Sequence, residues 1–329
     1  MSGLVFGIDN LPQHNGYVVT QGTFDGVHKG HVHVLQQVVR IAQQEHLPSI
    51  LITFHPHPRL IVNPNDKSLA LLSSIKEKAQ RILDLGIDTV LVLPFTEEIA
   101  SLSPEEFISN ILVQKLKVKH MVVGYDHRFG KNRSGGFQEL IQFAPKFGFQ
   151  VSEISPKEID EIAVSSTRIR KALQNGNLNE ANELLGYNYT LTGTVVHGQK
   201  RGRTIGFPTA NLHIDEPSKL IPNYGVYAGF ACLLKTENST QPFLGTTNRI
   251  PLVLNLGVRP TVDGTQFVIE AHLLDFSGDL YDQELQLELV EFIRPEKKFE
   301  SFDDLKNQIQ LDALNARTLL QSYLKNSTA

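Results

Sequence analysis

The stretch TQGTFDGVHKGH, residues 20–31, joins three glycines to two histidines directly after an apolar run. Glycines let backbone N–H groups approach a ligand closely, and the helix expected to follow would add the positive end of its dipole. His28 and His31 stand three residues apart, so both rings would share one face of the first helical turn. Rings placed there can donate hydrogen bonds to a triphosphate and to the charge that develops as it is cleaved. A tight turn with two surface histidines is the simpler alternative, but the strand before the motif and the helix after it favour a phosphate site.

Three further segments offer phosphate-binding groups at the ends of predicted strands or at the start of a predicted helix. They are TFHPHPR at 53–59, VVGYDHRFGKNRSGG at 122–136 and SSTRIRKAL at 165–173. Together they supply hydroxyls, arginines and glycines, which a nucleotide requires, although each alone also fits a solvated loop or an ordinary helix cap. The sequence contains neither GxxxxGK(S/T) nor GxGxxG, so P-loop and Rossmann dinucleotide sites are both disfavoured.

A second group of candidates lies in GTVVHGQKRGRTIGFPTANL, residues 193–212. Its glycines alternate with lysine and arginine, so the loop could fold over phosphates. Thr209 and Asn211 are two residues apart, and in an extended chain their side chains would face the same side. A hydroxyl and an amide oxygen are hard donors that suit Mg²⁺ already bound to nucleotide phosphates. A turn with an asparagine cap is the alternative for this segment.

Glu270 stands inside an apolar segment, VIEAHLLDF, at 268–276. A carboxylate in such a strand is most simply an outward-facing surface residue. The functional alternative is a carboxylate at the mouth of a barrel, placed to accept a proton from a substrate hydroxyl.

The elements that must position the first group alternate between apolar runs and amphipathic stretches. The predicted strands are 17–21, 49–54, 88–93, 118–123 and 149–154, and the predicted helices between them include 29–45, 74–85 and 104–116. Such alternation predicts a parallel sheet covered by helices on both faces, with ligands beyond the carboxyl ends of its strands. The motif at 20–31 follows the first strand, so we expect it at that edge.

The pattern changes after two short helices predicted between residues 166 and 186. Strands are predicted at 190–196, 226–234, 252–256, 267–276 and 284–292, with turn signals between them and one closing helix that contains Leu305 and Tyr323. Several short strands without intervening helices predict an antiparallel barrel. We place the domain boundary near Gly186–Asn188, and we expect 235–250 to be a polar loop.

Composition excludes several functional classes. The chain has 329 residues, which favours two domains, and its formal net charge of -4 gives no global basic footprint for duplex nucleic acid. Cys232 is the only cysteine, so no intrachain disulfide forms and a reducing compartment fits. The sequence starts without a signal-peptide pattern, and no apolar run approaches the ~18 residues needed to span a membrane. We therefore expect a cytoplasmic protein that binds neither membrane nor nucleic acid.

The two groups of motifs together resemble the bacterial bifunctional riboflavin kinase and FAD synthetase family. The first half carries GTFDGVHKGH, TFHPHP, GYDHRFG and SSTRIR, and the second carries GQKRGRTIGFPTANL, GVYAG, NLGVRPT and EAHLLDF. The likeness runs from about residue 17 to about residue 320, and His127 is a departure, because the family more often has an aromatic such as Phe there.

The resemblance implies an α/β plus β architecture. A Rossmann-like parallel α/β FMN adenylyltransferase domain would occupy 1–186, and an antiparallel β-barrel riboflavin kinase domain with a terminal helix would occupy 187–329. The barrel would phosphorylate riboflavin to FMN with ATP and Mg²⁺, and the first domain would then adenylylate FMN to FAD and release pyrophosphate.

The resemblance also implies roles for individual residues. Glu270 would be the kinase base, His28 and His31 would act in adenylyl transfer, and Thr209 and Asn211 would hold Mg²⁺. The ATP contacts implied in the adenylyltransferase are Gly22, Phe24, Asp25, His28, His31, Asp126, Ser166, Thr167 and Arg168, with Phe129 as a weaker candidate for nucleotide or flavin contact. The ATP and flavin contacts implied in the kinase are Gly198, Arg201, Gly202, Gly206, Pro208, Thr209, Asn211 and Arg259.

Three other hypotheses fit parts of the sequence. Another HxGH nucleotidylyltransferase, acting on a different phosphorylated acceptor, explains the first half and leaves GFPTANL without a role. An RNA-binding barrel fused to a synthetase-like domain lacks the aromatic platform and basic groove expected for single strands. An inactive flavin sensor is the third. The sequence determines neither the oligomeric state nor the path of FMN between the two sites.

Overall fold

A computed structural model describes residues 3–65, 68–154, 164–198, 202, 206–234, 249–261 and 264–327, without the side chains of 259–261, 264–266 and 327. The chain divides into two compact units, Met1–Ser166 and Thr167–Ala329. The sequence-based boundary at 186/187 falls later, between two elements of the second unit. Within the described ranges, no helix combines the length and the apolar character needed to cross a membrane.

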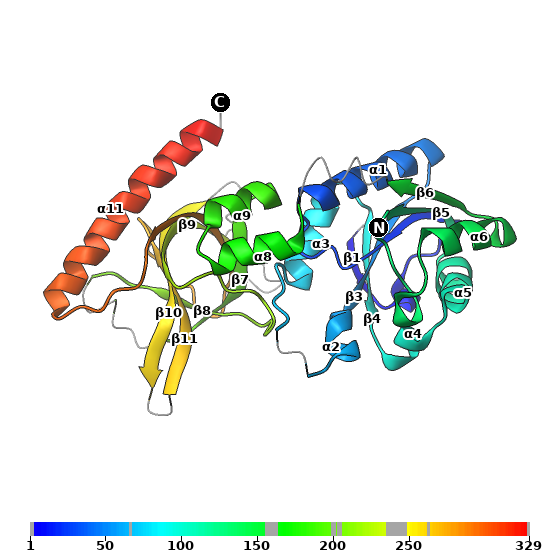
Figure 1. The fold of residues 1–329 in the computed structure, drawn as a ribbon. Helices are drawn as coiled ribbons and strands as arrows, with labels where there is room; N and C mark the ends of the chain where they lie inside the picture. Colours follow the sequence, from blue (N-terminus) through cyan, green and yellow to red (C-terminus); the bar gives the residue numbers. More distant parts are fainter. Residues whose placement is uncertain are drawn as a thin grey trace. The chain divides into compact units, whose positions relative to one another are not determined.

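The first unit is built on a six-stranded parallel sheet with the order β1-β4-β3-β2-β5-β6 (Figure 1). Its strands are β1 (Gly3–Phe6), β2 (Tyr17–Gln21), β3 (Ser49–His55), β4 (Thr89–Pro94), β5 (Val118–Gly124) and β6 (Gln150–Ile154). This confirms the predicted parallel α/β sheet. Strand β1 was not predicted, because four residues at the edge of the sheet carry too short a pattern to stand out.

Side chains alternate between two cores, one on each face of this sheet. Val18 of β2 packs with residues of α1 (Lys29–Glu45) and α3 (Ile75–Asp84), whereas Val19 packs on the opposite face. The opposite core is covered by η2 (Phe107–Lys115) and α6 (Phe137–Phe147). Shorter helices complete the unit: η1 (Ile8–Asn10), α2 (Pro58–Val62), α4 (Glu97–Ser101), α5 (Pro104–Glu106) and η3 (Lys131–Arg133). The helix predicted at 104–116 therefore begins as α5 and continues with π-helical geometry, in which the Leu116 N–H donates to Ile111 O.

The second unit is a closed antiparallel barrel with the strand order β10-β11-β8-β7-β12-β9. Its strands are β7 (Tyr189–Val196), β8 (Ala210–His213), β9 (Gly225–Leu233), β10 (Ile250–Thr261), β11 (Gly264–Leu273) and β12 (Glu284–Arg294). The predicted antiparallel barrel is confirmed. Strand β8 was not predicted as a separate strand. Most of the segment predicted as a polar loop, 235–248, lies outside the described residues.

One long helix, α11 (Phe302–Ser327), packs on the outer face of the barrel. Its Ala316 and Leu320 join a core with Val253 and Val290 of the barrel strands. Asp312 of α11 is only 2% exposed and accepts three hydrogen bonds from two guanidinium nitrogens of Arg294 at the end of β12, the shortest of them to its Oδ2 at 2.7 Å. The predicted closing helix is therefore fixed by an apolar face and by one forked ion pair.

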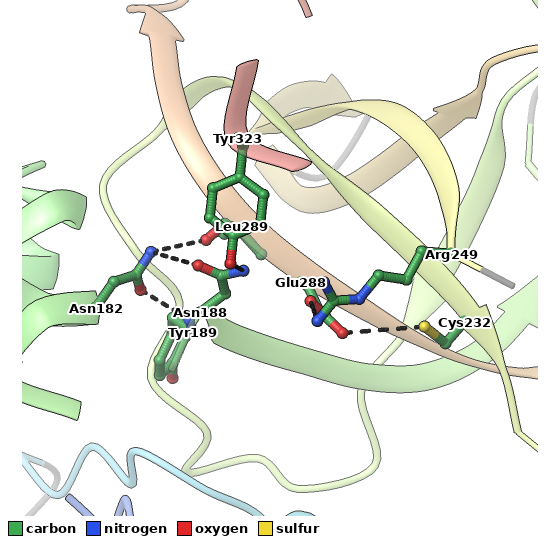
Figure 2. Close-up of polar contacts among 8 residues, drawn as sticks. All are labelled: Asn182, Asn188, Tyr189, Cys232, Arg249, Glu288, Leu289 and Tyr323. Atoms are coloured by element: carbon green, nitrogen blue, oxygen red, sulfur yellow. Dashed lines mark hydrogen bonds and ion pairs between the residues drawn. The ribbon is translucent and has the colours of Figure 1, made fainter. Parts of the chain in front are cut away.

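The short helices α8 (Ser166–Gln174) and α9 (Leu178–Leu185) precede the barrel, and α9 packs on β7 and β12. Asn182 of α9 accepts a hydrogen bond from the Tyr189 N–H at 2.8 Å and donates one to Leu289 O at 2.9 Å (Figure 2). Asn188 then donates to the hydroxyl of Tyr323 in α11 at 2.9 Å. These contacts tie α9, two barrel strands and the terminal helix together.

Candidate functional site

A pocket of about 720 Å³ lies in the first unit at the carboxyl ends of its parallel strands. Gln21 ends β2, Phe54 is near the end of β3 and Gly124 ends β5, and all three line it. The predicted site residues that line it are Gly22, Phe24, His28, His31, Asp126, Phe129 and Ser166. Parallel strands end at a common sheet edge, so segments far apart in the sequence meet there.

The turn between β2 and α1 has an unusual backbone. Phe24 has φ 43°, Gly26 has φ 83° and Val27 has φ 38°, all in the left-handed region. A branched residue such as Val27 adopts that region only where the surroundings impose it, and such strain concentrates at functional sites. The chain thereby turns sharply enough for α1 to start directly at the pocket.

His28 and His31 form a stacked pair at the start of α1. His28 is the N-cap, and its Nδ1 accepts a hydrogen bond from the His31 N–H at 3.4 Å. The two rings stack with centroids 3.6 Å apart and an interplanar angle of 15°, and Phe24 packs on His31 at 5.0 Å. The predicted shared face is therefore present, with both rings lining the pocket.

Burial lowers the pKa of His31 well below its ordinary value, and the nearby charges of His28 and Lys78 add to that effect. The ring is therefore neutral near pH 7. Its Nδ1 is buried and has no hydrogen-bond partner within the described part of the chain. A polyphosphate would favour the protonated ring, because a nearby negative charge raises the pKa of a histidine. The buried, neutral His31 ring is therefore suited to take up a proton when an anion binds in the pocket.

Asp25 has a supporting position and is not among the residues that line the pocket. Its carboxylate accepts hydrogen bonds from the N–H groups of Leu72 at 2.9 Å and Ser73 at 3.1 Å. Its backbone oxygen accepts a hydrogen bond from the Ser166 hydroxyl at 3.1 Å. Asp25, which the resemblance implies as an ATP contact, therefore fixes the turn before α1 and anchors Ser166.

Lys78 of α3 was missed by the sequence analysis. Its buried ammonium donates to Thr23 O at 2.7 Å and to the Thr53 hydroxyl at 2.9 Å, so it supports the motif from behind. A sequence signal exists, because Lys78 lies four residues before Ile82, on the face of the helix that should be apolar. A charged residue on a buried face requires partners.

SSTRIR contributes to the pocket through its serines alone, because Ser165 and Ser166 line it. Thr167 and Arg168 belong to the second unit. Both are exposed, and the guanidinium of Arg168 contacts Glu180 Oε1 at 2.7 and 2.8 Å. In this structure Arg168 therefore ties α8 to α9.

GYDHRFG forms the wall of the pocket beyond β5. Phe129 is buried and exchanges backbone hydrogen bonds with Gly135 at 2.9 and 3.0 Å, which holds the loop as a small bridge. The His127 ring stacks on Phe129 with centroids 5.6 Å apart. Burial lowers the pKa of His127 to about 4, and the charges of Arg128 and Arg133 contribute. Asp126 is exposed and lines the same pocket.

The second unit brings together another set of predicted residues on the barrel wall. Glu270 of β11 is the cross-strand partner of Asn211 of β8, and directly opposed residues in antiparallel strands have neighbouring side chains. The strand register places both away from the face that carries Leu254 and Ala271. Glu270 is nonetheless only 9% exposed, so it is not an ordinary surface acid.

Two glycines of the basic loop lie against the proposed oxygen donors. A Cβ added to Gly198 would lie 2.3 Å from Asn211 Nδ2, and one added to Gly202 would lie 3.4 Å from Thr209 Oγ1. The same added Cβ at Gly202 would lie 2.2 Å from Phe207 O, so only glycine fits there. The backbone at Gly198 and Gly202 therefore lies against Asn211 and Thr209, respectively.

The remaining kinase candidates are only partly described. Gly206 has φ 86°, a conformation that favours glycine, and Pro208 O accepts a hydrogen bond from His272 Nδ1 at 2.8 Å. Arg201 and the side chain of Arg259 lie outside the described residues. His272 was missed by the sequence analysis, although it stands two residues after Glu270 on the same face of the strand.

Known families match both units. A family model described as FAD synthetase matches residues 10–168, and one described as riboflavin kinase matches residues 185–320. The chain is 39% identical over 317 residues to a bifunctional riboflavin kinase/FMN adenylyltransferase from Escherichia coli strain K12, covering 95% of this chain and 96% of that protein. It is 38% identical to a protein of the same name from Listeria monocytogenes, covering 91% of each. A crystal structure of a macrolide-efflux protein from Streptococcus pneumoniae shares the fold, with a TM-score of 0.81, 29% identity, and coverage of 95% of this chain and 98% of that one.

Proposed function

Because the chain belongs to the bifunctional riboflavin kinase/FMN adenylyltransferase family, we propose that its barrel phosphorylates riboflavin to FMN and that its first unit converts FMN to FAD. ATP is the second substrate of both reactions. The observation that supports this proposal is that each unit brings together its own candidate residues for phosphate chemistry, with His28 stacked on His31 in one and Glu270 opposite Asn211 in the other.

Adenylyl transfer in the first unit requires no enzyme nucleophile. A phosphate oxygen of FMN attacks the α-phosphorus of ATP, a new P–O bond forms, and the bond to the β-phosphate oxygen breaks to release pyrophosphate. Negative charge grows on the α-phosphoryl oxygens and on the leaving group during this step. His28, Gly30 and His31 at the start of α1 line the pocket where that charge would develop, and donors fixed in advance stabilise a transition state effectively.

Phosphoryl transfer in the second unit does need an acceptor for a proton. The 5′-hydroxyl oxygen of the ribityl chain bonds to the γ-phosphorus of ATP, ADP leaves, and the hydroxyl proton passes to a base. Glu270 supplies that base in our proposal, since it is a carboxylate held in a mostly buried position beside Asn211.

Mg²⁺ fits the oxygen donors of this second site. Thr209 and Asn211 offer a hydroxyl and an amide oxygen beside the backbone of Gly202 and Gly198, and Mg²⁺ prefers such hard ligands together with waters and nucleotide phosphates. The ion would neutralise phosphate charge during transfer. Nucleotide phosphates and waters would complete the shell, because Mg²⁺ is usually bound through a few protein ligands together with substrate phosphates.

Incubation of the protein with riboflavin, ATP and Mg²⁺, followed by chromatography, tests both activities at once. We expect FMN to appear first and FAD to follow. Supplied FMN that is never converted to FAD would exclude the adenylyltransferase. An HxGH enzyme for another acceptor would leave both flavins unchanged, and a sensor would bind flavin without turnover.

The cytoplasm is the proposed location of both reactions. Burial and the charge of Glu288 raise the pKa of the single cysteine, Cys232, to about 11, so its thiol stays protonated and unreactive (Figure 2). A protein whose single cysteine is a buried thiol suits a reducing compartment. Fractionation of cells that make the protein would test the location.

A further inference from the structure

One end of the pocket in the first unit is aromatic. Phe54 and Phe95 pack edge to face with centroids 5.3 Å apart, and Phe107 packs on Phe129 at 5.7 Å. All four line the pocket. A wall of this kind suits a planar, mostly apolar ring system, whereas the His28 and His31 end suits phosphates.

Gln21 places a polar group at this aromatic end. It is the last residue of β2, and strand alternation puts it on the same face as Tyr17 and Val19, whose core contains Phe54 and Phe129. Gln21 is 8% exposed and lines the pocket, and its Oε1 is buried without a hydrogen-bond partner in the described part of the chain. A buried amide without a partner is costly, so the position indicates a ligand group that completes it.

His127 presents a second such atom. Its Nε2 is buried and has no hydrogen-bond partner among the described residues, and its ring stacks on Phe129 of the same wall. The ring is neutral near pH 7, because its pKa is about 4. A neutral imidazole can donate or accept one hydrogen bond, so it can pair with an uncharged group of a ring system.

We propose that Gln21 is a specificity-determining residue that hydrogen-bonds the imide edge of the flavin ring, with His127 as a second partner at the same wall. The inference rests on the proposed function. The isoalloxazine system is apolar at its dimethylbenzene end, and its other end carries an N3–H between two carbonyl groups. A glutamine amide offers one acceptor and two donors, so it matches that edge. Adenine is smaller and has no N–H between two carbonyl groups.

The test compares FMN with 3-methyl-FMN, in which the N3–H is replaced by a methyl group. For the wild-type protein we expect KM for 3-methyl-FMN to exceed KM for FMN by about tenfold or more, because a site built for a hydrogen bond rejects a substrate that lacks it. In Gln21→Met, which is close in size, KM for FMN should rise about tenfold and the two flavins should become equivalent. KM for ATP should not change.

Gln36→Leu is the matched control, because Gln36 is exposed on α1 and should keep wild-type discrimination. Gln21→Leu is a second variant of the same site, and the rate of FAD formation at saturating FMN verifies that the first unit of each preparation is folded. Equal KM values of wild type for the two flavins would overturn the role of Gln21 while leaving FAD synthesis intact. A raised KM for ATP in both Gln21 variants would assign the residue to adenine. Absence of FAD from wild type with FMN would instead remove the proposed function.

Discussion

The two units position their candidate phosphate-binding residues with different structural devices. The first uses a sharp turn and the start of a helix, where left-handed residues such as Val27 bring two histidines to a sheet edge. The second uses strand register, which sets Glu270 opposite Asn211, and two glycines, Gly198 and Gly202, whose backbone lies against Asn211 and Thr209. This difference follows from the two proposed reactions. Adenylyl transfer needs no base, so the first site needs hydrogen-bond donors for the charge on the phosphates. Phosphoryl transfer to a hydroxyl group releases a proton, so the second site needs a proton acceptor.

The largest effect that separates the two units is expected for the histidine pair. Replacing His28 and His31 with Ala removes the stacked rings and should lower FAD formation from FMN by at least ~100-fold, as expected for lost transition-state donors. FMN formation from riboflavin should stay near the wild-type rate. Rate assays with each flavin measure both activities, and an equal loss of the two would mean that the histidines serve the fold.

Glu270→Gln makes the reciprocal change. Glutamine is nearly isosteric, so the strand pairing and flavin binding should persist while the base is lost. General bases contribute ~10²–10⁴-fold, and we expect the lower end, because phosphoryl transfer with a loose transition state depends less on a base. FAD formation from supplied FMN should continue. A normal riboflavin kinase rate would leave Glu270 without a catalytic role.

Asn211→Ala should have a smaller and conditional effect. The variant removes one proposed oxygen ligand, so the kinase should need more Mg²⁺ for half-maximal rate, by about tenfold, while the phosphates and Thr209 keep the remaining shell. A Mg²⁺ titration of the kinase rate measures the shift. Asn188→Ala, which removes a hydrogen bond to Tyr323 elsewhere on the barrel, is the matched control. An unchanged titration curve would remove Asn211 from the site.

The smallest expected effect concerns the extent of the kinase unit. Fragments 167–329 and 187–329 should both make FMN, but the longer fragment should melt several degrees higher, because it keeps α9 and its buried Leu178, Leu184 and Leu185 on the barrel. Thermal unfolding of both fragments makes the comparison. Equal melting temperatures would support the sequence-based boundary near residue 187, and a folded but inactive longer fragment would contradict modular activity.

The parts of the molecule that the sequence predicts well are those with a regular pattern. Alternation and helical periodicity predict five of the parallel strands and the barrel. The rule that ligands bind beyond the carboxyl ends of parallel strands predicts a shared site, and His28, Asp126 and Ser166 do line one pocket. Short elements are not predicted, because β1 and β8 have four residues each, which is too few to show a periodic pattern.

The supporting residues are harder to predict, since their roles depend on tertiary partners. Asp25 is predicted from its motif as an ATP contact, but the motif does not reveal that its carboxylate also holds the backbone of Leu72 and Ser73. Arg168 is likewise predicted as an ATP contact, and only the structure reveals its ion pair with Glu180 in the next helix. Nothing in the sequence indicates a functional role for Gln21, the last residue of a strand. Only the fold reveals that its amide is buried at the aromatic wall of the pocket.

The most direct test of the two-site account is a mixture of two inactivated proteins. One carries Glu270→Gln and the other carries Ala at positions 28 and 31, and neither alone should convert riboflavin to FAD at an appreciable rate. Mixed in equal amounts with riboflavin, ATP and Mg²⁺, they should form FAD, because the second protein makes FMN and the first adenylylates it. A mixture that yields no FAD, while each protein retains its single remaining activity, would contradict the claim that two independent sites act in sequence through free FMN.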